Sequence, residues 1–102
     1  MIVKFSSPKL EKSIIDKATR NSTYGELSKI VKMRYDMLIA AVKLGDISHK
    51  RPPRRHKLSG KLSKYHSITV KKGLRFWVVP INYSGSELSA TEILIDKIKD
   101  YH

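Results

Sequence analysis

The hydrophobic pattern changes its period once along the chain, and this change limits the possible folds more than any other feature. Up to Gly45 the apolar residues are spaced as on amphipathic helices, whereas from Tyr65 onward β-branched and aromatic residues fill short runs between turn residues. Helices early and strands late favour an α+β fold. A chain of 102 residues suits one domain, so we expect residues 1–102 to form a strand and two helices packed on a small antiparallel sheet.

The first part of the chain predicts a strand followed by a helix. Ile2–Phe5 has the β-branched and aromatic residues of a short strand. Ser7 followed by Pro8 is typical of an N-cap and the first helical position, and the helix should run to about Arg20. Its buried side should carry Leu10, Ile14, Ile15 and Ala18.

A second helix is predicted behind a capping box. Thr23 would be its N-cap, with Glu26 reaching back to the cap backbone. The helix should continue to about Leu44, where Gly45 is placed to end it. Its buried stripe would be Leu27, Ile30, Val31, Leu38, Ala41 and Val42.

The second half of the chain predicts a loop, a hairpin and a last strand. The loop covers Gly45 to Lys57. Tyr65–Val70 and Leu74–Ile81 should pair through a tight turn at Lys71-Lys72-Gly73, and Thr91–Ile98 should form the final strand.

The charge is unevenly distributed, which predicts an anionic partner. Ile47 to Ser86 contains ten basic residues and no Asp or Glu, whereas the rest of the chain holds the other 11 basic and all 9 acidic residues, a balance of only +2. Such a stretch attracts polyanions, either nucleic acid or an acidic protein. The alternative is a basic, solvated surface. A peripheral membrane role is disfavoured, because these cations lie among turn and strand signals and not on an amphipathic helix.

The sequence gives a cytoplasmic protein as the default. It contains no cysteine, which is compatible with a reducing compartment. No apolar run approaches the roughly 18 residues that span a bilayer, and the segment from Met1 to Phe5 is too short and too soon polar for a signal peptide.

Two histidines have neighbours that suit proton transfer. His56 lies in a run of cations, and His102 follows Asp100 and Tyr101. An imidazole can donate or accept a proton near neutral pH, because its unperturbed pKa is about 6.5. Imidazoles, a carboxylate, a phenol and several cations together are suited to cleaving RNA. A zinc site is disfavoured, because no two of the four histidines have the usual ligand spacing.

Four short segments in the second half of the chain resemble the RelE/ParE superfamily of bacterial toxins, and specifically the HigB-like ribonucleases that cut messenger RNA. The segments are His56-Lys57-Leu58-Ser59-Gly60, His66-Ser67-Ile68-Thr69-Val70, Lys72-Gly73-Leu74-Arg75-Phe76 and Asp100-Tyr101-His102. The resemblance covers about half of the chain and implies a RelE-like microbial RNase fold.

The chain departs from the family pattern at two positions that usually help to hold the RNA phosphate. Ser59 and Thr69 stand where the family has a lysine and an arginine. We expect neighbouring cations to take over this role, namely Arg54, Arg55, Lys57 and Lys61.

The resemblance implies cleavage of ribosome-bound mRNA by attack of the ribose 2′-OH, without a metal or other cofactor. His102 would be the first group for proton transfer and His56 the second. Asp100 would orient an imidazole, Tyr101 would stack on a base or donate a hydrogen bond, and Arg75 would bind the phosphate. The expected RNA-binding residues are Arg54, Arg55, Lys57, Lys61, Lys71 and Lys72.

The implied partners are the ribosome with its mRNA and a cognate antitoxin, a HigA-like DNA-binding protein. Two alternatives are a ParE-like toxin that inhibits a topoisomerase and a non-catalytic RNA- or DNA-binding module. His49 and His66 match no family position that does chemistry, and Trp77 is expected in the core between strand and helices.

Overall fold

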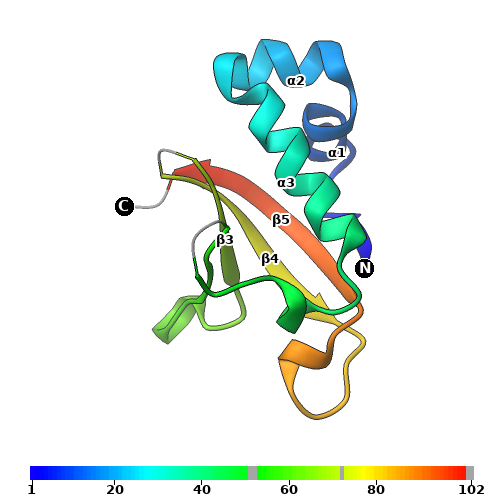
Figure 1. The fold of residues 1–102 in the computed structure, drawn as a ribbon, viewed down its shortest axis with the longest axis vertical. Helices are drawn as coiled ribbons and strands as arrows, with labels where there is room; N and C mark the ends of the chain where they lie inside the picture. The colour runs from blue at the N-terminus through cyan, green and yellow to red at the C-terminus, as the bar shows by residue number, and fades with distance from the viewer. Residues whose placement is uncertain (51–52, 72, 101–102) are drawn as a thin grey trace.

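Three α-helices and a five-stranded sheet make up the described part of the chain (Figure 1). The computed structural model describes residues 1–50, 53–71 and 73–100. Its helices are α1 (Pro8–Ile15), α2 (Lys17–Tyr24) and α3 (Ser28–Ala40). Its strands are β1 (Ile2–Phe5), β2 (Arg55–Lys57), β3 (His66–Lys71), β4 (Leu74–Ile81) and β5 (Glu92–Asp100). Short 3-10 turns are η1 (Gly25–Leu27), η2 (Leu44–Asp46), η3 (Gly60–Leu62) and η4 (Glu87–Ser89).

The sheet has the order β1-β5-β4-β3-β2. The predicted α+β class is therefore confirmed, and the hairpin of β3 and β4 lies where the sequence indicated. Strands β2 to β5 pair antiparallel as predicted, whereas β1 joins the sheet through a parallel pairing with β5, so the sheet as a whole is mixed. The first and last strands lie side by side, a long-range pairing that no local pattern specifies.

The first predicted helix is divided in two at Asp16. The backbone of Asp16 is extended (φ −80°, ψ 117°), and its carboxylate accepts hydrogen bonds from the Thr19 amide (3.0 Å) and hydroxyl (2.7 Å). Asp16 thus acts as the N-cap of α2. Because its side chain competes with the helical backbone for hydrogen bonds, a new helix begins here and α1 does not continue.

The predicted capping box at Thr23 is wrong. Thr23 lies inside α2 and donates its hydroxyl to the carbonyl of Thr19 (2.7 Å). The turn comes two residues later at Gly25, whose φ of 56° suits a residue without a Cβ. The second helix also stops at Ala40 and not near Gly45, and Val42, predicted to be buried, is 71% exposed.

A buried arginine joins the three helices. Arg20 on α2 is only 7% exposed. Its guanidinium donates to the carbonyl of Ile14 at the end of α1 (2.8 Å) and to the hydroxyl of Ser28 at the start of α3 (3.1 Å). It therefore satisfies a carbonyl left without a helical partner where α1 ends.

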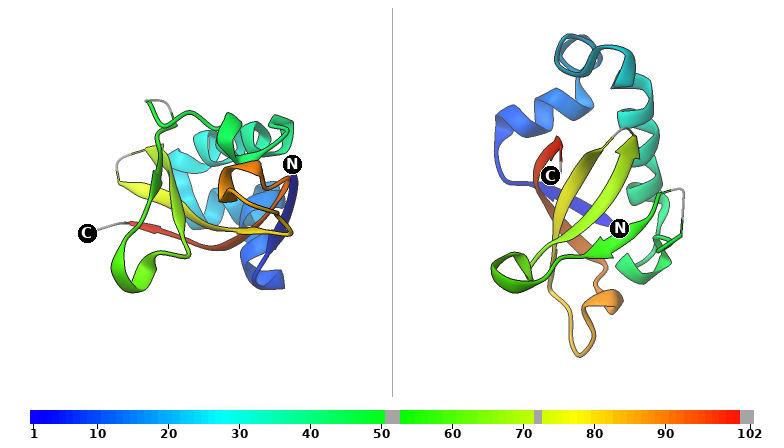
Figure 2. Two further views of the ribbon diagram at one scale, coloured as in Figure 1. Left: turned by 90° about the horizontal axis from the view of Figure 1, so that it is seen from below. Right: turned by 90° about the vertical axis from the view of Figure 1, so that its left-hand side faces the viewer.

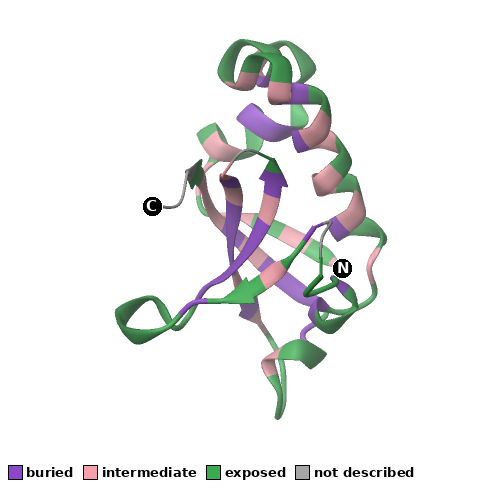
Figure 3. Cartoon of the chain, turned by 60° about the vertical axis from the view of Figure 1, so that its left-hand side comes forward, coloured by how far each residue is buried: buried purple, intermediate pink, exposed green. Residues whose placement is uncertain are grey.

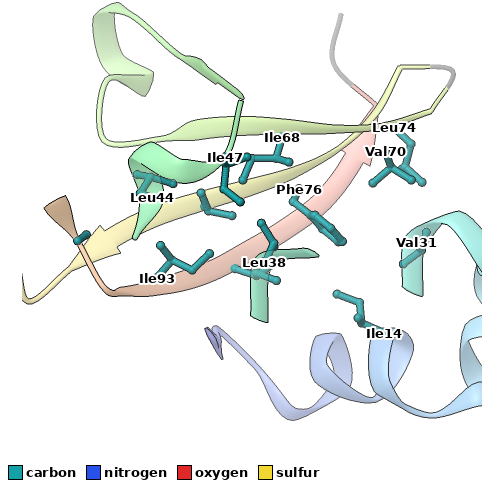
Figure 4. Packing of buried hydrophobic residues seen from close by; sticks show 13 residues of the cluster. Ile14, Val31, Leu38, Leu44, Ile47, Ile68, Val70, Leu74, Phe76 and Ile93 are labelled. Carbon is teal, nitrogen blue, oxygen red and sulfur yellow. The ribbon is translucent and has the colours of Figure 1, made fainter. Parts of the chain in front are cut away.

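The main core lies between the helices and one face of the sheet (Figure 4). Strand alternation sends every second side chain of β3, β4 and β5 to this face, where they meet apolar residues of α1 and α3. The residues labelled in the close-up include Ile14, Val31 and Leu38 from the helices and Ile68, Phe76 and Ile93 from the strands. No helix among the described residues is long and apolar enough to cross a membrane.

Candidate active site

The sheet has one face away from the helices, and the strands place several predicted site residues on it. Leu74, Phe76 and Val78 of β4 belong to the main core, so Arg75 and Trp77 between them lie on the opposite side, which we call the open face. Figure 2 shows the sheet with the helices gathered on its other side.

Two cross-strand rows of side chains cross the open face. In one row His56 lies opposite Ser67, which lies opposite Trp77. In the other row Thr69 lies opposite Arg75, which in turn lies opposite Lys99. His56 is exposed and Arg75 is half-buried. Strand spacing places the Cα atoms of His56 and Arg75 roughly 12 Å apart, with β3 between them.

The end of β5 lies beside Arg75. Lys99 pairs with Arg75 and the backbone of Asp100 pairs with Leu74, so β5 ends next to the β3–β4 turn (Figure 1). The sheet thus brings Arg75 close to the backbone of Asp100. Tyr101, His102 and Lys72 lie outside the described residues.

Two of the expected RNA-binding cations lie on the other side of β2. Arg55 pairs with the core residue Ile68, and its Nε donates to the carbonyl of Ile47 (3.0 Å). Lys57 pairs with His66 and forms an ion pair with Glu87. Neither residue shares a face with His56, because successive side chains of a strand alternate. Lys61 is exposed on η3.

A basic hollow of about 280 Å³ opens at the start of β2, beside the end of β3. Its polar lining comes from three separate parts of the chain, and it contains no acidic residue among its described lining. We call it the basic hollow; it is lined by Arg34, Pro53, Arg54, Thr69, Val70, Lys71, Gly73 and Arg75.

Arg34 is the residue of this hollow that sequence reasoning missed. It lies on α3, and nothing in its local pattern separates it from the other cations of that helix. Only the packing of α3 against the sheet brings it to the residues around Arg75.

Trp77 is buried, but not between the strand and the helices as predicted. It packs on the open face with Leu58 and Tyr65 in a second, smaller apolar cluster. The ammonium groups of Lys97 and Lys99 lie 4.9 and 5.0 Å from the centre of its ring. Figure 3 shows that the loop between β2 and β3 is exposed over most of its length.

Tyr65 is held in this cluster by its hydroxyl. It donates to the carboxylate of Asp96 (2.5 Å), and this hydrogen bond together with burial raises the pKa of Tyr65 above its usual value. Tyr65 is 5% exposed and Trp77 is 4% exposed, so both rings are largely covered. They pack against Leu58 in the loop between β2 and β3.

His66 is a buried structural residue. Its Nε2 lies 3.1 Å from the carboxylate of Glu87, and its side chain is 2% exposed. A carboxylate can only accept, so Nε2 carries the proton, and Nδ1 is then a buried acceptor with no partner among the described residues. Burial lowers the pKa of His66, although the Glu87 carboxylate opposes this effect.

No group of three His, Asp or Glu side chains in the described part of the chain lies close enough to hold a metal ion.

No family model matches the sequence, and no curated protein is significantly similar to it. The resemblance to RelE/ParE toxins therefore stays a prediction from four short motifs.

Proposed function

We propose that this chain is the toxin of a type II toxin–antitoxin system, a HigB-like endoribonuclease that acts in the cytoplasm and cuts mRNA on the ribosome. The observation that carries the proposal is the position of Arg75. It lines a basic hollow whose described lining contains no acidic residue, and it pairs with β5, which ends at Asp100. RNA cleavage without a metal requires cations at the phosphate and groups for proton transfer; Arg75 would supply the first, and His102, two residues along the chain from Asp100, is assigned to the second.

In the proposed reaction a base removes the proton of a ribose 2′-OH, and the 2′-oxygen attacks the adjacent phosphorus. The bond from phosphorus to the 5′-oxygen breaks, and an acid protonates that oxygen. The products are a 2′,3′-cyclic phosphate and a 5′-hydroxyl end. Arg75 would stabilise the charge that develops on the phosphate, since a guanidinium can bind it through two hydrogen bonds.

The two imidazoles divide the proton transfers in this proposal. His102 is assigned the first role, and Asp100 and Tyr101 would orient it or the RNA. His56 is assigned the second role, because its side chain is exposed on the open face and accessible to RNA. His56 and Arg75 lie on the same face with β3 between them, so the substrate would have to bridge the two rows.

The antitoxin is proposed to cover this basic face with acidic groups, as the charge of the chain favours. Co-expression with the product of the neighbouring gene, followed by purification at low salt, should yield a complex whose association slows as salt is added. Failure of that product to co-purify would argue against a toxin.

The function is tested by inducing the chain in cells and mapping RNA 5′ ends. Wild type should arrest growth and produce new 5′-hydroxyl ends within translated messages. His102→Ala should abolish both, because loss of a proton-transfer group lowers rates by about 10²–10⁴-fold, while antitoxin binding persists. His56→Ala should give a comparable loss if it is the second acid or base. Growth arrest with no new RNA ends would instead indicate a non-catalytic or topoisomerase-inhibiting protein.

A further inference from the structure

Arg34 on α3 reaches the basic hollow from the helix side of the sheet. Its Nε is buried and has no hydrogen-bond partner among the described residues. A buried donor without a partner is destabilising, so such a group is explained by something that binds there, such as a water, an ion or a ligand. The neighbouring acid on α3, Asp36, is paired with Lys32 (2.5 Å) and lines no part of the hollow.

Three other cations approach the same space from the sheet. Arg54 precedes β2, Lys71 ends β3, and Arg75 lies on β4. Together with Arg34 they bring three guanidinium groups and one ammonium group around a volume of about 280 Å³. Like charges gathered in this way repel one another, and an anion in the hollow would remove that repulsion.

The backbone at Arg54 is also held in an unfavourable conformation. Its φ is 50°, in the left-handed region that disfavours residues with a Cβ. Hydrogen bonds on both sides fix it, from the Thr69 amide to the carbonyl of Pro53 (3.0 Å) and from the Arg55 amide to the carbonyl of Ser48 (2.8 Å). An arginine kept where glycine would fit better indicates that its side chain is needed there.

We propose that Arg34, Arg54 and Lys71 bind a backbone phosphate of single-stranded RNA next to the linkage that is cut, with Arg34 as a positioning residue. This inference rests on the proposed function. Arg75 lies on the open face and also lines the hollow. An RNA strand that runs from His56 past Arg75 would therefore place its next phosphate in the hollow, beside β3. Guanidinium groups suit this ligand, because their planar forks match phosphate oxygens.

An acidic peptide is the competing ligand, and the lining argues against it. The described apolar lining is limited to Pro53 and Val70. Peptide recognition needs pockets for side chains or pairing along a strand edge. Phosphate recognition needs only the converging cations, and a groove of cations that follows the backbone is how proteins bind single strands.

The test uses an uncleavable 2′-O-methyl oligoribonucleotide and a set of variants in which one linkage at a time is a neutral methylphosphonate. Binding to the full-length protein is measured at several salt concentrations. In wild type, one neutral linkage beside the scissile position should weaken binding by about 10-fold, as loss of a charged hydrogen bond does. Arg34→Gln should bind the normal strand about as weakly, and the same neutral linkage should then have no further effect.

The salt dependence gives a second readout. Arg34→Gln should reduce the slope of log K against log salt by about 0.7, the value for one phosphate contact on a single strand. Lys17→Gln removes one exposed cation from α2, outside the hollow, and should leave the linkage effect intact. Thermal unfolding of both variants checks that the fold is retained.

Three results would overturn the proposal. The first is an equal linkage effect in wild type and in Arg34→Gln, and the second is wild-type affinity in Arg34→Gln. The third is displacement of the RNA by hexaglutamate, added at the same total negative charge as the RNA, in wild type but not in Arg34→Gln. That result would assign the hollow to an acidic protein. Because the oligonucleotide cannot be cleaved, binding that depends on Arg34 stands even if the chain proves not to be a nuclease.

Discussion

Two groups of basic residues lie at opposite ends of the β2–β3 pair, and they differ in the carboxylates that the described residues place beside them. At one end Lys57 and the buried His66 both contact Glu87. At the other end Arg34, Arg54, Lys71 and Arg75 surround a hollow whose described lining contains no acid. The first group fastens η4 to the sheet, and the second is open to an anion from outside.

This difference shows that a basic stretch of sequence is not one functional surface. Arg54, Arg55 and Lys57 are close together in the chain, but their side chains have different surroundings. Arg54 lines the basic hollow, Arg55 lies on the core side of β2, and Lys57 forms an ion pair with Glu87. Lys57 contributes to the stability of the fold through its ion pair with Glu87, while the cations of the basic hollow line a space of about 280 Å³ that an anion can enter.

The largest expected effect is a difference in RNA cleavage between variants at the two ends of the β2–β3 pair. Arg75→Ala should reduce cleavage of ribosome-bound mRNA by about 100-fold, because it removes a donor that stabilises charge in the transition state. Lys57→Ala, at the other end, should leave the rate nearly unchanged. The measurement is single-turnover cleavage at saturating ribosome concentration. Equal, small losses in Arg75→Ala and Lys71→Ala would remove Arg75 from the site.

The next effect concerns stability at the Glu87 end. Glu87→Ala should lower the free energy of unfolding by about 2 kcal/mol, because it leaves the Nε2 proton of His66 buried without an acceptor. Lys57→Ala should lower it by less than about 1 kcal/mol, as expected for an exposed ion pair. Urea denaturation of the two variants measures the difference. If the two losses proved equal, the hydrogen bond to His66 would not be the stabilising contact.

A smaller effect separates stability from binding at the hollow. Arg54→Gly should raise the free energy of unfolding by about 1 kcal/mol, because glycine adopts the left-handed backbone without strain, and it should weaken RNA binding several-fold. Arg54→Ala should weaken binding equally without the gain in stability. Thermal unfolding and RNA titration of both variants test this, and an Arg54→Gly protein that bound RNA as well as wild type would contradict a role for Arg54.

The smallest expected effect is a pH dependence from His66. Burial holds its pKa in the folded state below the unfolded value of 6.5. The unfolded chain therefore binds the proton first, and stability should fall as pH decreases from about 6.5 toward the folded pKa. His66→Gln should show a weaker fall over this range, and His49→Gln should keep the wild-type profile. Denaturation curves between pH 7 and pH 5 measure it; identical profiles in wild type and His66→Gln would rule out His66 as the source.

The pH dependence has a second part from Glu87. Its hydrogen bond from Lys57 lowers the pKa of the carboxyl below its ordinary value. The stability that this carboxylate contributes is present above its unfolded pKa and is lost as pH falls further through the folded pKa. Both groups at this end of the β2–β3 pair thus favour the folded state at neutral pH.

The sequence by itself determined the α+β class and the position of the β3–β4 hairpin. These features depend on local periodicity and turn residues, which act over a few positions of the chain. Leu74–Ile81 is the same in the prediction and in the structure, because a run of apolar residues after Lys71-Lys72-Gly73 has few alternatives. The proposed chemistry also came from the sequence, through the four motifs and the unequal charge.

Tertiary structure alone decided the parallel pairing of β1 with β5 and the composition of the basic hollow. The helix break at Asp16, by contrast, rests on a local contact, the hydrogen bond from the Thr19 amide to the Asp16 carboxylate. Residues that the fold brings together, such as Arg34 and Arg75 in the lining of the hollow or Lys57 and Glu87 in an ion pair, lie at least 30 positions apart in the chain. No local pattern records which distant residues will meet, because burying the apolar faces of helix and sheet together fixes that choice.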